Sequence, residues 1–319
     1  MRAIALLILL AGLIPWHVAT ADCDIQPPVK DVFDYPQFMK DHASFHDYEI
    51  RIFSAGECAD SFEEPGGFEV LRGGKMIHSE TGFSFSIGYP LDGDQSPDSV
   101  KVAVGNDITG QGIPDALISE NSGGAHCCYT FHILQLGSQF KDVQEIPLLD
   151  ADESSFVRRL GIKSLVLSSA DFSDFDYFPA SFARSPAGRV FLSFQAGKFA
   201  LDTSLMRSNV PVSDAINKCA LLFKQSRDWK GTENAGQPAG LWYYATDLIY
   251  TGNEAAAWTF LDQAWGGSAA DKKKYLDDYR QRLKRSVYYQ GLESLQKAPM
   301  SDAGQKIDWT KQCFEYLRG

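Results

Sequence analysis

Residues 46–205 alternate between short apolar segments and polar breaks, which is typical of β-strands. The segments are rich in β-branched and aromatic residues, and most are bounded by Gly, Pro, Asp or Ser. They predict strands at 48–54, 67–72, 83–89, 99–105, 115–120, 129–137, 164–169, 189–194 and 198–202. Short strands at roughly 8–15-residue spacing indicate antiparallel meanders, hence a sandwich or a propeller-like stack of sheets. Three clusters of comparable length, near 46–89, 99–146 and 164–202, are candidate blade-like units.

After residue 205 the pattern changes to the longer period of amphipathic helices. Apolar residues recur three or four positions apart, on one predicted helix face, at Leu276, Tyr279, Leu283 and Val287. Gly252 stands where a helix would end, and Asn253 is positioned to cap the next one. We therefore expect two helices in a hairpin and a third packed across them. The predicted fold class is α+β, with a β-rich domain at 22–205 and an α-helical domain at 206–319.

The first 21 residues have the pattern of a secretory signal peptide. Arg2 supplies a positive charge, residues 3–13 are apolar, and residues 19–21 offer small side chains for cleavage. The apolar run is shorter than the ~20 residues that a membrane-spanning helix needs, and no later stretch is long and apolar enough. We expect a mature protein without a transmembrane segment, exported to the periplasm or the medium.

The chain is acidic, and this limits the partners that it can have. Its formal net charge is −11, and no basic stripe interrupts the acidic composition. A protein of this charge does not attract phosphate backbones, so the composition argues against nucleic-acid binding. The expected partner is a protein or another component of the cell envelope.

Six cysteines in an exported chain favour disulfides over free thiols. Cys23 and Cys58 flank the first β-rich stretch, and Cys219 and Cys313 bracket the helical region, so we predict these two bridges. Six cysteines allow 15 connectivities, and Cys127 and Cys128 stay open: they bond to each other, or each pairs elsewhere. Consecutive Cα atoms are ~3.8 Å apart, closer than in an ordinary disulfide.

A loop at 105–120 has the rhythm of an oxygen-rich calcium site. Its sequence "GNDITGQGIPDALISE" places oxygen-bearing side chains at alternate positions and glycines between them. Every second side chain of a tight loop can point at one centre. The predicted ligands are the side chains of Asp107, Thr109, Gln111 and Asp115 and the carbonyl of Ile113. The competing interpretation is a structural turn in which Thr109 and Gln111 bond the backbone.

The segment "NDITGQGIPDALISE" resembles the FG-GAP/VCBS-type repeat, whose usual form is D-x-N-G-D-G-x-P-D followed by an apolar strand. That resemblance implies an integrin-α-like propeller blade with calcium in its loop. The segments "SGGAHCCYTFHIL" and "DLIYTGNEAAAWTFLDQAW" resemble parts of exported bacterial proteins that join such a repeat to a helical C-terminal region. Thr109 and Gln111 replace the usual Asp or Asn. Because charge sets affinity in oxygen sites, any calcium here should bind weakly.

His126 and Cys128 are the candidates for an enzyme function. Two residues apart on one strand face, they would lie ~6–7 Å apart at Cα, which suits a nucleophilic pair in a hydrolase or a thiol-redox protein. No orienting group or oxyanion hole is marked. His126 and His132 cannot share one ion, because six residues of strand separate them by about 20 Å. We favour a structural role for both cysteines.

Two further groups are expected to be structural. Asp171, Asp174 and Asp176 occur among aromatic residues in "DFSDFDYFPASF", and we expect these acids to face water above the packed rings. The aromatic residues of the helical region are expected to be core rather than a groove: Trp242, Tyr243, Trp258 and Trp265. With no complete catalytic set, the sequence predicts an exported binding or structural protein.

Overall fold

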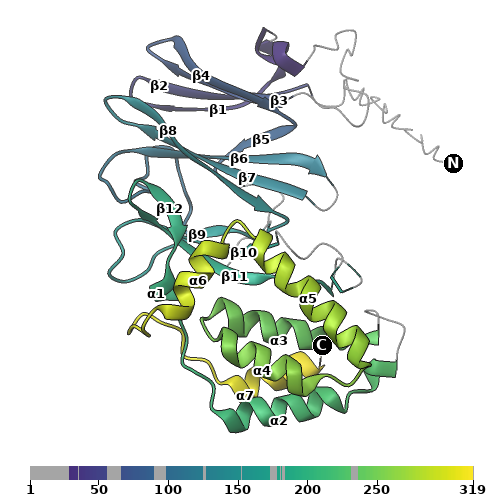
Figure 1. The fold of residues 1–319 in the computed structure, drawn as a ribbon. Coiled ribbons are helices and arrows are strands. Elements are labelled where there is room, and N and C mark those ends of the chain that lie inside the picture. The colour runs from purple at the N-terminus through teal and green to yellow at the C-terminus, as the bar shows by residue number, and fades with distance from the viewer. Residues whose placement is uncertain are drawn as a thin grey trace, which may run out of the picture.

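The computed structural model describes residues 29–34, 36–55, 66–89, 98–124, 127–151, 153–172, 178–179, 181, 184–230 and 236–318. Their strands form three four-stranded antiparallel sheets, and their helices gather in the C-terminal part of the chain (Figure 1). The α+β class predicted from the sequence is therefore confirmed.

Each sheet is a meander of four consecutive strands. Sheet A contains β1 (Met39–Phe45), β2 (Tyr48–Ser54), β3 (Gly66–Arg72) and β4 (Lys75–Gly82). Sheet B contains β5 (Ser84–Ile87), β6 (Asp115–Gly124), β7 (Cys127–Leu136) and β8 (Phe140–Leu149). Sheet C contains β9 (Ser155–Val157), β10 (Val166–Asp171), β11 (Gly188–Gln195) and β12 (Lys198–Leu201).

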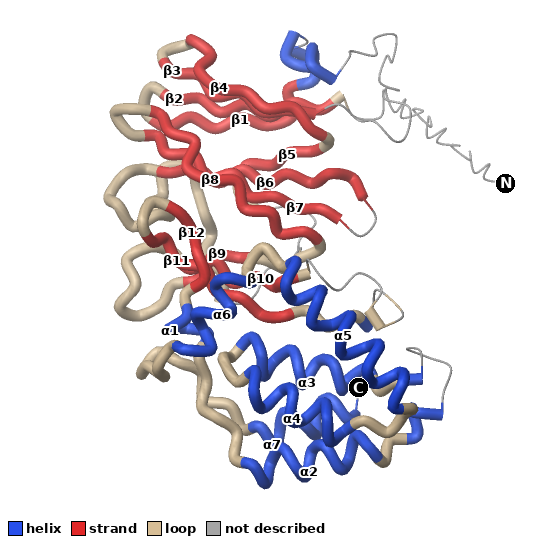
Figure 2. Tube along the Cα trace, in the orientation of Figure 1, coloured by secondary structure: helices blue, strands red, loops and turns tan. Residues whose placement is uncertain are grey.

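The three sheets and the helices are stacked in chain order from top to bottom of Figure 2. The three predicted clusters match sheets A, B and C except at β5, which was predicted in the first cluster but belongs to sheet B. The sheets do not close into a propeller over the described residues. The predicted strand at 99–105 is wrong: none of these residues belongs to a strand, although Val100 N–H donates to the Phe156 carbonyl of β9, and a turn lies at the end of the segment. Four strands were not predicted: β1, β4, β8 and β9.

Sheet B is covered on both faces, which explains the apolar sequence of β7. Phe131 and Ile133 lie in the large core that continues through sheet C into the helices. Leu134 lies in the smaller core between sheets A and B. Alternate residues of a strand point to opposite faces, so a central sheet needs apolar residues on both. His132, on the face toward sheet A, and Gln135 are buried polar exceptions on β7.

The helices follow sheet C and share its core. They are α1 (Thr203–Met206), α2 (Ser213–Lys224), α3 (Ala239–Tyr250), α4 (Glu254–Ala264), α5 (Ala269–Arg285), α6 (Tyr289–Lys297) and α7 (Trp309–Arg318). The α3–α4 hairpin and the third helix, α5, occur where predicted. None of the described helices combines the length and the apolar character that crossing a membrane requires.

In the turn between α3 and α4, Gly252 ends α3 as predicted. Asn253 does not cap α4 with its side chain, so that prediction is wrong. Gly252 has φ +80°, and Gly252 N–H and Asn253 N–H donate to the carbonyls of Ile249 and Leu248, the pattern of a Schellman motif. The Asn253 side chain makes no cap hydrogen bond. The Asn253 side-chain amide instead donates to Ser208 Oγ, 2.9 Å away. Both Asn253 and Ser208 are buried.

Two other predictions for this region are corrected. Val287 lies beyond the end of α5 and is 66% exposed, so it is not part of the apolar stripe. Asp171 does not face water: it is buried, and its Oδ2 accepts hydrogen bonds from Tyr250 on α3 and from Ser286. Asp174 and Asp176 lie outside the described residues. Trp242 and Trp265 are buried core residues, as predicted.

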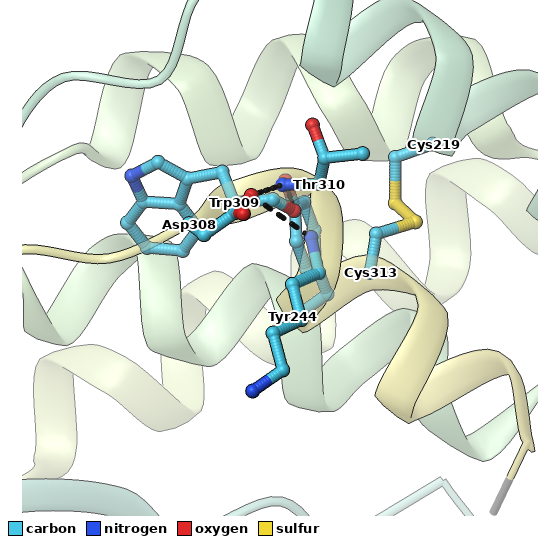
Figure 3. Close-up of a disulfide and its surroundings, with 7 residues drawn as sticks. Cys219, Tyr244, Asp308, Trp309, Thr310 and Cys313 are labelled. Carbon is cyan, nitrogen blue, oxygen red and sulfur yellow. Dashed lines mark hydrogen bonds between the residues drawn. A yellow bond between two sulfur atoms is a disulfide. The ribbon is translucent and has the colours of Figure 1, made fainter.

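The predicted Cys219–Cys313 disulfide is present and joins α2 to α7 (Figure 3). Both cysteines are buried, and the bond spans 94 residues of sequence. Trp309 packs edge-on against Tyr244 of α3 in the same region. The disulfide therefore closes the helical region around its central helix. Cys23 and Cys58, the other predicted pair, lie outside the described residues.

Candidate metal centre

Six ionisable side chains gather where sheet A faces sheet B. His78 and Glu80 are two residues apart on β4, an edge strand, so they share one face. Sheet B contributes the other four, from three strands: Glu120, His132, Asp142 and Glu145. We call these six residues the intersheet cluster.

His132 is the buried centre of the intersheet cluster. Its side chain is 2% exposed and is packed between the rings of Phe68 and Phe85. Its Nε2 lies 3.0 Å from Glu120 Oε2 in a hydrogen bond. An ionised carboxylate only accepts, so Nε2 carries the proton in this bond. The second ring nitrogen, Nδ1, is thereby left for another partner.

Nδ1 of His132 points at carboxylates without forming a hydrogen bond to them. It lies 3.3 Å from Glu80 Oε2, yet among the described residues it has no hydrogen-bond partner. Burial alone would lower the pKa of His132, but the Glu120 hydrogen bond and the charges of Glu80, Glu120 and Glu145 outweigh burial and raise that pKa. The site therefore favours a positive charge at this nitrogen, which a proton or a metal ion can supply.

Two sets of three potential ligands overlap within the cluster. The ligand atoms of Glu80, His132 and Glu145 all lie within 4.8 Å of one another. The same holds for those of His78, Glu80 and Asp142. Ligand atoms of a tetrahedral zinc site are ~3.4 Å apart at bonds of ~2.1 Å. Small rotations of the exposed Asp142 and Glu145 side chains would close either set.

A β-bulge in β8 brings Asp142 and Glu145 to the same face. Glu145 pairs directly with His132, and Asp142 with Leu134, while a register shift falls between them. Residues three apart on a regular strand point to opposite faces. The bulged residue, Val143, absorbs the extra step, so both carboxylates turn toward sheet A. Bulges that re-aim side chains are frequent at functional sites.

Glycine at position 82 makes room for the Glu120 carboxylate. A Cβ at Gly82 would lie 2.6 Å from Glu120 Oε1. Glu120 can therefore approach β4 and hold the His132 ring from behind. A carboxylate that orients a ligating histidine in this way is a recurrent feature of metal sites.

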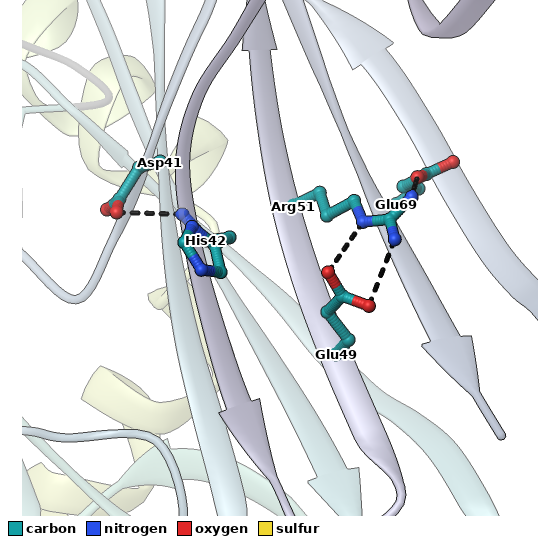
Figure 4. A network of polar contacts seen from close by, with 5 residues as sticks. All are labelled: Asp41, His42, Glu49, Arg51 and Glu69. Atoms are coloured by element: carbon teal, nitrogen blue, oxygen red, sulfur yellow. Dashed lines mark hydrogen bonds and ion pairs between the residues drawn. The ribbon is translucent and has the colours of Figure 1, made fainter. Parts of the chain in front are cut away.

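The carboxylates of the intersheet cluster have histidine neighbours but no lysine or arginine partner among the described residues. On the outer face of sheet A, Arg51 bonds Glu49 and Glu69 (Figure 4). By contrast, no Lys or Arg among the described residues forms an ion pair with the four acids of the cluster. The hydrogen bond from His78 lowers the pKa of Glu80, assisted by the charge of His132. The cluster therefore carries excess negative charge.

The predicted calcium loop is held by hydrogen bonds within itself. Asp115 is buried, and its Oδ2 accepts from the N–H groups of Ile108 and Thr109 at 2.8 Å and from Thr109 Oγ1 at 3.0 Å. Burial raises the pKa of Asp115, and the nearby charge of Asp107 raises it further, against the lowering effect of these hydrogen bonds. Thr109 thus serves the turn.

The other predicted loop ligands also have local roles. The two carboxylate oxygens of Asp107 accept from Gln111 N–H at 3.0 Å and Gly112 N–H at 2.9 Å. Gln111 Oε1 accepts from Gln135 at 3.1 Å. The side chains of Thr109 and Gln111 thus bond other side chains rather than the backbone, which the competing interpretation expected them to bond. The turn is nevertheless held by hydrogen bonds to Asp107 and Asp115, and calcium binding, with the Ile113 carbonyl among its ligands, stays a prediction.

Thiol chemistry at Cys128 requires a thiol, and Cys128 is disulfide-bonded. Because Cys219 pairs with Cys313, the partner of Cys128 is one of three cysteines whose side chains the structure does not describe: Cys23, Cys58 or Cys127. The proposed base, His126, also lies outside the described residues. In this oxidised state Cys128 has no thiolate with which to attack a substrate.

Comparisons with known proteins found no relative. No protein-family model matches the chain, and no curated protein or solved structure matches it. The resemblance to the FG-GAP/VCBS-type repeat therefore stays a prediction.

The sequence showed His132 but not its role. Its ligating neighbours come from β4 and β8, two strands that were not predicted. One signal was available: in "YTFHILQL" a single residue that titrates near neutral pH, His132, stands within a mostly apolar strand. A histidine at such a position is buried and needs charged or polar partners.

Proposed function

We propose that this chain is an exported binding protein of structural character whose sheets A and B hold a divalent transition metal, with Glu80, His132 and Glu145 as ligands. The observation that supports it most is the buried Nδ1 of His132, directed at carboxylates and left without a hydrogen bond among the described residues. The signal-like first 21 residues support export.

The ligand types indicate which metal the site would take. One imidazole with two carboxylates suits zinc and its transition-metal neighbours. Calcium prefers oxygen ligands only, so His132 would disfavour it. Glu120 would act from outside the coordination sphere by holding the ring through Nε2. Binding would connect β4 of sheet A to β7 and β8 of sheet B and so stabilise their packing.

Isothermal titration of tag-free, chelator-treated protein with Zn²⁺ tests this proposal. We expect binding that Glu145→Gln and His132→Gln weaken tenfold or more, and that Glu120→Gln weakens about 10- to 100-fold. Glu145 is exposed, so its substitution should leave folding intact. The matched controls are Glu49→Gln on β2 and His42→Gln on β1. Both residues lie in sheet A but outside the intersheet cluster (Figure 4). Absence of zinc binding, or equal affinity in all variants, refutes the proposal.

Calcium at residues 105–115 is a separate proposal from the zinc centre. The proximity of two acids, Asp107 and Asp115, is the feature that supports it. A calcium titration followed by thermal melting tests it: calcium bound at residues 105–115 would raise Tm. Substitutions at the zinc ligands Glu80, His132 and Glu145 should leave that rise unchanged.

A further inference from the structure

The intersheet cluster contains two ligand sets, and Glu80 belongs to both. One carboxylate oxygen of Glu80 faces the histidine of one set, and the other oxygen faces the histidine of the second set. Oε1 accepts from His78 Nε2 at 2.9 Å, while Oε2 lies 3.3 Å from His132 Nδ1. A carboxylate whose oxygens face two different imidazoles has the arrangement of a bridge between two metal ions.

The two sets have matching compositions. Each combines one histidine, the shared Glu80 and one carboxylate of β8, namely Glu145 with His132 and Asp142 with His78. The β8 bulge is what supplies both acids on one face. A single metal ion would use only one of them, and the bulge would then have no part in binding.

The charge of the cluster also fits two ions better than one. With neutral imidazoles its four carboxylates carry four negative charges, and no Lys or Arg among the described residues pairs with them. One divalent ion bound by Glu80, His132 and Glu145 leaves two of these charges without a metal beside them, that of the half-buried Glu120 and that of the exposed Asp142. Two divalent ions balance the charge.

We propose that the intersheet cluster is a dinuclear metal centre in which Glu80 bridges two divalent transition-metal ions. One ion is bound by Glu80, His132 and Glu145, and the second by Glu80, His78 and Asp142. The inference rests on the proposed function, since it adds a second ion to the same site. Ions that share a bridging carboxylate lie ~3.5–4 Å apart in two-metal sites.

Metal stoichiometry tests this inference and separates it from the proposed function. Tag-free, chelator-treated protein is titrated with Zn²⁺ against a chromophoric chelator, and the equivalents bound per chain are counted. We expect two equivalents in the wild type, one in His78→Gln and in Asp142→Asn, and two in the control His42→Gln. Asp142 is exposed, so its variant should remain folded, which circular dichroism checks.

Each of the other outcomes refutes either the dinuclear centre alone or the dinuclear centre together with the single-metal site. One equivalent in the wild type that His78→Gln and Asp142→Asn leave unchanged refutes the dinuclear centre and keeps the single-metal site. No bound zinc refutes both. Two equivalents that survive the His78 and Asp142 substitutions place the second ion elsewhere and also refute the bridge. In the Mn²⁺-loaded protein, electron paramagnetic resonance should show a spin-coupled pair, whereas two isolated ions contradict a shared Glu80.

Discussion

Removing the Cys219–Cys313 disulfide should lower the stability of the whole helical region. The bond closes a loop of 94 residues between α2 and α7. In the chain-entropy account, a loop of this length contributes about 4.6 kcal/mol by restricting the unfolded chain. Native disulfides in practice contribute ~2–5 kcal/mol. The substitution Cys219→Ala with Cys313→Ala also removes two buried sulfur atoms, which adds a packing cost, so about 4.6 kcal/mol is the entropic part of the expected loss.

The expected change in melting temperature follows from the size of the chain. Unfolding entropy of ~2.1 cal/mol/K per residue gives about 0.7 kcal/mol/K for a chain of this size. A loss of about 4.6 kcal/mol therefore lowers Tm by roughly 7 °C. Differential scanning calorimetry under non-reducing conditions measures the shift, and urea denaturation gives the free energy independently.

Single substitutions provide the control for the disulfide prediction. Breaking the bond at either Cys219 or Cys313 should cost the same as breaking it at both, because one cross-link is lost in each case. Reduction of the wild-type protein should give a shift at least as large, because it also breaks the disulfide of Cys128. A change below about 2 °C, or single losses that add up to the double loss, would refute the entropic reasoning.

Three further predictions concern other parts of the fold. Burial raises the pKa of Asp247 to about 6 from 3.8, so the folded state binds this proton more tightly than the unfolded chain; stability should fall by up to about 3 kcal/mol between about pH 4 and 6. Asp247→Asn should remove that fall in urea denaturation curves, and an unchanged pH profile contradicts it. Gly110 and Gly112 both have positive φ, but only a Cβ at Gly110 would meet backbone, 2.4 Å from the Ser164 nitrogen. Gly110→Ala should therefore destabilise by at least about 1 kcal/mol more than Gly112→Ala, and equal losses argue against the close approach of Gly110 to Ser164. Millimolar calcium should leave Tm unchanged if residues 105–115 form a hydrogen-bonded turn, whereas a clear rise establishes the calcium site.

Three of the missed strands, β1, β4 and β8, bury less apolar surface than the predicted ones, whereas the fourth, β9, is buried but only three residues long. β2 was predicted with its bounds, Tyr48–Ser54, because nearly every residue on one of its faces is buried. In β1 every residue is at least partly exposed. β4 and β8 are sheet edges with many charged residues. A strand with few buried positions leaves little periodic signal.

The segment 99–105 shows the opposite case. Its alternation of apolar and polar residues predicts a strand, but alternation does not show whether a partner strand is within reach. Val102 is buried, yet the segment leads into a turn at Gly105, which approaches the ring of Phe45. Pairing depends on tertiary arrangement, and periodicity does not record it.

The intersheet cluster could not be predicted from sequence spacing for a related reason. Glu80 occurs in a polar segment whose pattern indicates exposure, and Glu145 occurs in another. Only the stacking of sheet A on sheet B brings them to His132, and only the bulge in β8 turns Asp142 to the same face. In a local loop such as 105–115 the candidate ligands are close together in the sequence, so their spacing can be recognised. In a site formed between two sheets the ligands are far apart in the sequence, and no spacing indicates that they meet.

The most direct test of the metal centre is an anomalous difference map at the zinc edge, from crystals of the zinc-loaded protein. We expect a peak ~2.0–2.2 Å from His132 Nδ1 and from carboxylate oxygens of Glu80 and Glu145. A map without a peak between sheets A and B, in which His132 Nδ1 donates a hydrogen bond to Glu80 in place of a metal bond, would contradict this expectation.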